Sequence, residues 1–152
     1  MESIKKTSYC ENESKTVSDI GILIFRLVLG VLMLTHGWQK LSNFGMMSSV
    51  FPDPIGLGPT VSLSLIIFAE FFCSILIIFG LFTRLATIPL MIGMIVAAFV
   101  VHANDPFAVK ELSFLYLSLY VALAFIGAGK FSVDYLLRGT YAKLCGKFRR
   151  SN

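Results

Sequence analysis

Charged residues are scarce in this sequence, and the charges that are present avoid several long stretches. Only 14% of the 152 residues are charged, whereas 56% are hydrophobic. Residues 85–101 and 112–129 contain no acidic or basic side chain at all. A helix needs roughly 20 apolar residues to cross the hydrocarbon of a bilayer, and these stretches approach that length. The lack of charge therefore indicates a membrane protein rather than a soluble domain.

Cysteine is also rare, and its placement excludes one class of membrane enzyme. The three cysteines are Cys10, Cys73 and Cys145, and no C-x-x-C motif is present. A membrane thiol-disulfide enzyme needs paired cysteines near the outer face, so disulfide chemistry is excluded. The connections between apolar stretches are too short for a dinucleotide-binding unit, and no cysteine cluster suits an iron-sulfur centre.

The apolar stretches predict an all-α membrane protein, an antiparallel bundle of four transmembrane helices. The expected spans are residues 20–41, 60–81, 85–101 and 112–126. They divide the chain into a polar N-terminal segment (1–19), a membrane domain (20–129) and a basic tail (130–152). The polar start lacks the pattern of a cleaved secretory signal, so we expect the first span to be retained.

Two segments outside the spans are apolar enough to touch the membrane. The first connection contains the apolar run 44–51 and then several prolines and glycines, which predicts a short interfacial segment or, alternatively, a lid over an outer cavity. In the tail, Ser132 can cap an amphipathic helix in which Leu136 and Leu137 are apolar and Arg138 is basic. We expect this helix to lie on the inner leaflet.

The distribution of lysine and arginine predicts the orientation. Ten of them fall on the side that carries both ends and the second connection, whereas only Lys40 and Lys110 fall on the other side. Short loops rich in these residues stay in the cytoplasm, so both termini are expected there. The net charge of +4 is then explained by topology and by contact with anionic lipid, and no nucleic-acid partner is implied.

Three side chains inside the expected spans demand explanation: Arg26 and His36 in the first, and Glu70 in the second. An ionised group in hydrocarbon costs at least about 2.5 kcal/mol, so each should face the bundle interior and have a partner. Counting helical rise from the inner ends places Arg26 within reach of Glu70, and we expect these two to pair. Glu70, Arg26 and His36 are the candidate catalytic residues, as a proton relay or ligand site. The alternative is a structural ion pair that fixes helix register.

A second group of candidates is expected at the outer surface. Arg26, Gly30, Met33, Gly37 and Lys40 form one stripe on the first span, which should line the interior. A pocket that opens outward above Arg26 and Glu70 would be lined by His36, Lys40, His102, Glu111 and Tyr116. The alternative for these outer charges is ordinary contact with lipid headgroups.

Haem and metal ions are not favoured as ligands of this pocket. The two histidines, His36 and His102, are expected at different depths, which does not suit axial ligation of a haem. His36, His102 and Glu111 have suitable chemistry for a metal but no diagnostic spacing, so no metal site is predicted.

Several motifs resemble those of the DoxX family of four-helix bacterial membrane proteins. They include HGWQKL at 36–41, PDPIGLG at 52–58, Glu70 within FAEFFCSILIIFGLFTR, HANDPF at 102–107, KELSFLYL at 110–117 and GAGKFSVD at 127–134. The resemblance implies a four-helix bundle in the bacterial inner membrane. It also implies an oxidoreductase role, because some members resemble the membrane subunit of an archaeal thiosulfate:quinone oxidoreductase and others are associated with oxidative-stress defence.

Two hypotheses follow. The first is an oxidoreductase subunit that interacts with a membrane quinone near His36 or His102 and depends on a redox partner protein, since this chain has no soluble redox domain. The second is a non-enzymatic assembly or envelope-maintenance factor that holds a partner's transmembrane segment. Substrate, partner and self-association into a homo-oligomer stay open.

Overall fold

Helices dominate the computed structural model, which describes the backbone of residues 2–138 and the side chains of residues 16–138. Four helices are long and apolar enough to cross a membrane, and they cover Thr16–Ser42, Pro59–Phe79, Thr83–Val101 and Phe107–Ile126. The described residues contain no strand. The predicted all-α bundle of four spanning helices is therefore confirmed.

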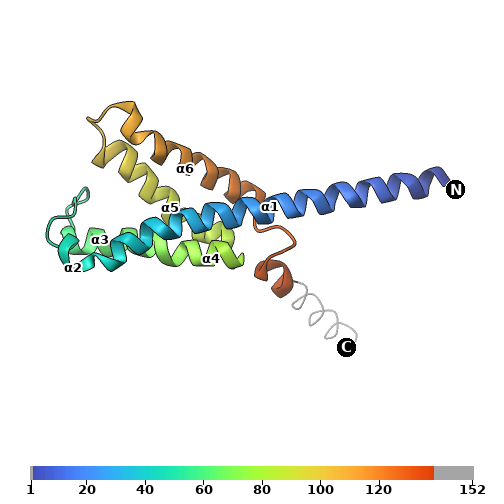
Figure 1. The fold of residues 1–152 in the computed structure, drawn as a ribbon, viewed down its shortest axis with the longest axis horizontal. Helices are drawn as coiled ribbons and strands as arrows, with labels where there is room; N and C mark the ends of the chain where they lie inside the picture. Colours follow the sequence, from blue (N-terminus) through green and yellow to red (C-terminus); the bar gives the residue numbers. More distant parts are fainter. Residues whose placement is uncertain (1, 139–152) are drawn as a thin grey trace, which may run out of the picture.

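The helices follow one another in a simple order along the chain (Figure 1). They are α1 (Glu2–Ser42), α2 (Phe44–Met47), α3 (Pro59–Ile67), the π-helix η1 (Phe68–Cys73), α4 (Ser74–Phe79), α5 (Thr83–Val96), the π-helix η2 (Ala97–Val101) and α6 (Phe107–Ile126). The second span is thus α3, η1 and α4 in continuous sequence, and the third is α5 with η2. Residues 133–138 form a further short helical segment.

The first helix begins earlier than the apolar pattern indicated. It starts at Glu2 rather than near Ile20 and extends beyond the bundle toward the N-terminus (Figure 1). The polar segment before Ile20 contains neither proline nor glycine, so nothing in it interrupts helical backbone. Pro59 lies in the first turn of α3, a position that tolerates proline because its missing N–H has no partner there anyway.

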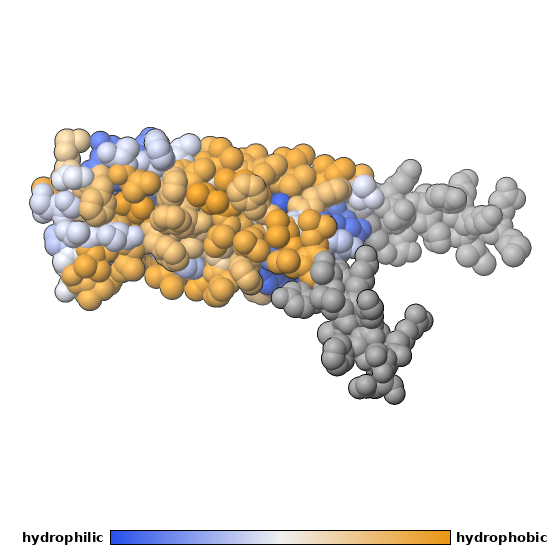
Figure 2. Space-filling model, turned by 90° about the horizontal axis from the view of Figure 1, so that it is seen from below, coloured by the Kyte–Doolittle hydropathy of each residue, from blue (hydrophilic) through white to orange (hydrophobic). Residues whose placement is uncertain are grey.

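The outer surface of the bundle is apolar. Figure 2 shows hydrophobic side chains over the middle of the molecule and hydrophilic residues at the two ends of the bundle. All four spanning helices contribute, with Val31, Phe72, Ile92 and Leu115 each about half exposed. Such a belt is stable against lipid hydrocarbon, where apolar groups need no cover and helices satisfy their own backbone.

The spanning helices pack as two pairs. Helix α1 lies against α3, η1 and α4, and α5 lies against α6. Helix α5 also contacts η1 and α4 and so joins the pairs, whereas α1 and α6 touch at few residues. The pairs diverge toward the end of the bundle that carries α2 (Figure 1). The contact between α1 and α6 is therefore much sparser than the contacts within each pair and those through α5.

Glycines set how α1 lies along the second span. A Cβ on Gly37 would lie 2.6 Å from the backbone nitrogen of Phe71 and 2.7 Å from the carbonyl carbon of Glu70. A Cβ on Gly30 would meet the carbonyl oxygen of Ser74 at 3.3 Å. Only glycine permits this approach, so the backbone of α1 at Gly37 lies level with Glu70.

The first connection is ordered by one carboxylate. Asp53 accepts hydrogen bonds from the backbone of Leu57 (3.1 Å) and Gly58 (2.7 Å) and from the hydroxyl of Ser62 (2.8 Å). These bonds, the one from Ser62 most of all, hold the pKa of Asp53 below its usual value. Helix α2 lies within the connection, and Met46 in α2 and Val50 just after it are strongly exposed. A short interfacial segment is present where one was expected.

The predicted cap of the tail helix is also present. The hydroxyl of Ser132 accepts the backbone N–H of Tyr135 at 3.2 Å, as an N-cap does. The rest of the expected amphipathic helix, from residue 139 onward, lies outside the described residues.

Candidate functional site

The side chain of Glu70 lies in the bundle interior and pairs with Lys40. Glu70 is in η1, its side chain is 6% exposed, and its Oε2 atom lies 2.5 Å from Nζ of Lys40. Lys40 comes from the last turn of α1, and its side chain is 23% exposed. A π-helical turn adds one residue to the helix and often marks a functional site. Here it surrounds the only acidic residue of the second span.

Three aromatic side chains lie beside this ion pair. The ring of His36 meets Tyr116 of α6 edge to face at a centroid distance of 6.0 Å, and Tyr116 stacks on Tyr120 at 6.2 Å. Both tyrosines are close enough to Glu70 to interact with it electrostatically. We call Lys40, Glu70, His36, Tyr116 and Tyr120 the polar cluster.

Tyr120 brings an unpartnered hydroxyl to the polar cluster. Its side chain is fully buried, and its oxygen has no hydrogen-bond partner among the described residues. A buried hydroxyl without a partner costs about 1–3 kcal/mol, so it is a natural place for a ligand oxygen or a water molecule to bind. The cluster thus offers an ammonium and a phenol as donors, a carboxylate as acceptor and flat ring faces for stacking.

Of the five residues predicted to line the outer pocket, the structure brings together His36, Lys40 and Tyr116. The other two lie apart from them. His102 instead pairs with Asp105, with 2.7 Å between Nδ1 and Oδ2. Glu111 is exposed, and its side chain makes no hydrogen bond or ion pair within the described part of the chain. Among residues 16–138, no three histidine, cysteine or acidic side chains converge as a metal site would require.

The predicted pairing of Arg26 with Glu70 is wrong. Arg26 is 2% exposed, and its two terminal nitrogens donate to the carbonyl oxygens of Ala128 (2.5 Å) and Phe131 (2.7 Å). A Cβ on Gly80 would collide with the Arg26 guanidinium, so Arg26 lies level with the C-terminal end of the second span. Ten residues separate Gly80 from Glu70, which is about 15 Å of helix. Arg26 therefore belongs to a different site.

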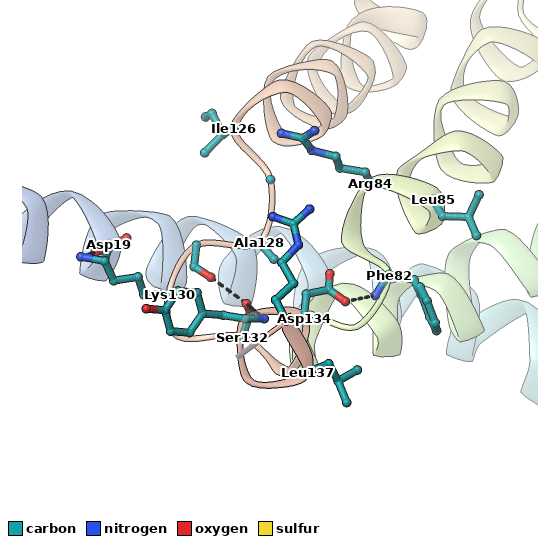
Figure 3. Close-up of a pocket in the computed structure, with 14 residues that line it drawn as sticks. Asp19, Phe82, Arg84, Leu85, Ile126, Ala128, Lys130, Ser132, Asp134 and Leu137 are labelled. Carbon is teal, nitrogen blue, oxygen red and sulfur yellow. Dashed lines mark hydrogen bonds and ion pairs between the residues drawn. The ribbon is translucent and has the colours of Figure 1, made fainter. Parts of the chain in front are cut away.

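That second site joins the segment after α6 to the turn between the second and third spans. Asp134 accepts the backbone N–H of Phe82 at 2.8 Å (Figure 3). It also accepts the N–H of Thr83 at 3.1 Å, and its own N–H donates to the carbonyl oxygen of Gly80 at 3.0 Å. Phe82 has a φ of 49°, which is costly for a residue with a side chain, and these bonds stabilise it. Arg26 and Asp134 together hold the segment 127–134 against the bundle, and we call this arrangement the inner clamp.

Sequence reasoning missed the role of Asp134, although a signal for it exists. Helix α5 starts after Phe82 and has no side chain at its N-cap that accepts a hydrogen bond. Asp134 is the only acidic residue after Glu111. A helix start without a local cap needs an acceptor from elsewhere, and this carboxylate was the one available.

Comparison with known proteins agrees with this architecture. The DoxX family model matches residues 21–103. The chain is 30% identical to "Inner membrane protein YqjF" of Escherichia coli over 127 residues, which is 81% of this chain and 96% of that protein. It is 30% identical to "Putative oxidoreductase CatD" of Bacillus subtilis over 118 residues, which is 76% of this chain and 86% of that protein.

A protein of Haemophilus influenzae is 29% identical over 132 residues, covering 82% of this chain and 87% of its own length. No solved structure matches the chain significantly. The matched region contains Arg26, His36, Lys40 and Glu70. It therefore includes the Lys40–Glu70 ion pair and the arginine of the inner clamp, but not Asp134. The family match covers more than half of the sequence, and the relatives align over most of their length. This chain belongs to the DoxX family.

Proposed function

We propose that this protein is the membrane subunit of a quinone-linked oxidoreductase of the bacterial inner membrane, and that the polar cluster binds the quinone. The observation that carries the proposal is the partly buried Lys40–Glu70 ion pair, close to Tyr120, whose hydroxyl has no partner among the described residues. An ion pair inside the apolar part of a membrane protein is expensive, and such groups usually serve a ligand or a proton pathway.

The chemistry of the cluster suits a quinone. A quinone has a flat ring with two carbonyl oxygens, and its reduction to a quinol consumes two electrons and two protons. Lys40 and Tyr120 can donate hydrogen bonds to a carbonyl, and the rings of Tyr116 and Tyr120 offer stacking faces. Glu70 and Lys40 can hold and pass protons at that position. The electrons come from a partner oxidoreductase.

The packing of the helices favours access from the lipid. The cluster draws Lys40 and His36 from α1 and Tyr116 and Tyr120 from α6, and these two helices touch at few residues. A ring dissolved in the bilayer can therefore enter by separating α1 from α6 without breaking the tightly packed contact of α1 with Glu70. The names of two relatives, an oxidoreductase and an inner membrane protein, support the class and the location. The charge distribution supports cytoplasmic termini.

The test is to purify the protein in native lipid and measure co-purifying quinone by mass spectrometry. We expect quinone in near-stoichiometric amount with the wild type and at least tenfold less with Glu70→Gln. The matched control is Glu111→Gln, which removes an exposed carboxylate of the same type outside the cluster and should leave the quinone unchanged.

Two outcomes contradict the proposal. If the wild type folds and carries no quinone even after quinone is added, the site does not bind one, and the assembly-factor hypothesis becomes the better account. If Glu70→Gln lowers only the folded yield, while the folded fraction keeps its quinone, the ion pair is structural.

A further inference from the structure

A cleft lies at the other end of the bundle, beside the inner clamp (Figure 3). It is formed by the turn before α5, the end of α6 and the segment that follows it, and its volume is about 660 Å³. Pockets for small ligands and headgroups have volumes of roughly 300–1,000 Å³, so the cleft is large enough to hold one. None of the residues of the polar cluster lines it.

The acidic groups that line the cleft are already paired. Asp19 forms an ion pair with Lys130 at 2.8 Å, and this carboxylate raises the pKa of Lys130. Asp134 is occupied by the backbone N–H groups at the start of α5. The charge of Asp19 is thus balanced by Lys130, and the charge of Asp134 lies close enough to Arg26 to interact with it.

Two arginines that line the cleft keep donors free. Arg84 donates from Nη2 to the carbonyl oxygen of Phe125 at 3.2 Å, which uses one of its five N–H groups. Its guanidinium lies over Gly127, where a Cβ would come within 3.3 Å of Nε. The side chain of Arg138 lines the same cleft and makes no hydrogen bond or ion pair with the described residues. Among residues 16–138, the two guanidinium groups of the cleft therefore have no carboxylate bound to them.

Apolar side chains stand at the edge of these charges. Leu85 is 65% exposed, Phe82 58% and Ile126 50%, and all three line the cleft. They lie at or next to the ends of the helices that are long and apolar enough to cross a membrane, so we expect them at the depth of the lipid headgroups. A ligand that matches both the guanidinium groups and the apolar side chains has an anionic head and apolar chains. The positive-charge rule places this end at the cytoplasmic leaflet, where anionic phospholipids concentrate and basic pockets between helices bind their headgroups.

We propose that this cleft is a binding site for an anionic phospholipid, in which Arg84 and Arg138 hold the headgroup phosphate and the acyl chains lie along Leu85 and Ile126. Guanidinium groups suit the task because their paired N–H donors match phosphate oxygens. The site is separate from the polar cluster, so it stands whether or not the protein binds a quinone.

The test is native mass spectrometry of the full-length protein titrated with phosphatidylglycerol or with phosphatidylcholine. We expect phosphatidylglycerol to bind at least tenfold more tightly than phosphatidylcholine. Arg84→Gln should weaken its binding at least fivefold, and Arg138→Gln should do the same. Lys110→Gln is the matched control, since it removes one positive charge at the opposite end of the bundle and should leave the affinity unchanged.

Because Arg84 also bonds to α6, Arg138→Gln keeps the test valid if Arg84→Gln fails to fold. Equal affinity for the two lipids, or unchanged phosphatidylglycerol binding in Arg138→Gln, would overturn the proposal. A parallel titration with inorganic phosphate separates a lipid site from a site for a free anion. Binding of phosphate with no preference for phosphatidylglycerol would also overturn it.

Discussion

Replacing Lys40 and replacing Glu70 should lower the free energy of unfolding by different amounts. In Lys40→Met the carboxylate of Glu70 stays behind without its partner, and its side chain is only 6% exposed. Removing one partner of a buried ion pair costs about 3–5 kcal/mol, and we expect a loss in that range. In Glu70→Gln the ammonium of Lys40 stays behind, but Lys40 is 23% exposed and lies in the last turn of α1.

The long side chain of Lys40 can turn toward the headgroups, so Glu70→Gln should cost only about 1.5–3 kcal/mol, the value of one charged hydrogen bond. The double variant Lys40→Met/Glu70→Gln should be more stable than Lys40→Met alone, because no buried charge is left without a partner. Trp38 provides the assay. It is the only tryptophan, and its ring lies 6.0 Å from that of Phe71, the residue after Glu70.

Unfolding in mixed micelles of increasing sodium dodecyl sulfate content, followed by Trp38 fluorescence and by circular dichroism, gives the free energy of unfolding of each variant. The reasoning is refuted if Lys40→Met is no less stable than Glu70→Gln. It is also refuted if the losses of the two single variants simply add in the double variant.

Three further predictions follow from the packing. Gly37→Ala should lower the free energy of unfolding by about 1–3 kcal/mol, because the added Cβ would meet backbone atoms of the second span. Gly45→Ala is the control and should be near neutral, because the space around Gly45 is open; equal effects of the two variants would contradict the close approach at Gly37. Arg26→Lys should keep the charge but lose one of two carbonyl bonds, so amide exchange in residues 127–134 should become faster and exchange around Glu70 should not change. Because the pKa of Asp53 is lowered in the folded protein, its hydrogen bonds should hold the first connection in place at neutral pH and be lost only as the pH falls through that lowered pKa. Amide exchange of residues 54–58 measured against pH would show this loss, and Asp53→Asn should abolish the pH dependence.

The sequence was informative about the spans because their signal is local. Apolar length and the scarcity of charge gave four helices, and the stripe from Arg26 to Lys40 does face the interior, with Gly30, Met33 and Gly37 buried. The first span was predicted at 20–41, close to the observed Thr16–Ser42, but the helical backbone already begins at Glu2, because hydropathy marks where a helix enters lipid and not where helical backbone begins. Ser132 was identified as a cap because its partner lies three residues away.

The candidate site was only partly predictable, because depth in a bundle depends on how helices slide past one another. Counting helical rise from assumed inner ends of the spans placed Arg26 within reach of Glu70. The close approach of Gly37 to the second span sets a different register between the two helices, in which Lys40 pairs with Glu70. The inner clamp depends on contacts between residues 51 to 105 positions apart, from Thr83 to Asp134 and from Arg26 to Phe131. No local pattern encodes such a contact.

The most direct test of the polar cluster as the quinone site is photoaffinity labelling. A photoreactive quinone analogue would be incorporated into vesicles with the wild-type protein, activated by light, and located by peptide mass spectrometry. The proposal predicts label on residues 36–40 of α1 and 116–120 of α6, displaced by excess natural quinone and strongly reduced in Glu70→Gln. Label spread over the lipid-facing surface without competition, or confined to the cleft beside Arg84, would contradict it.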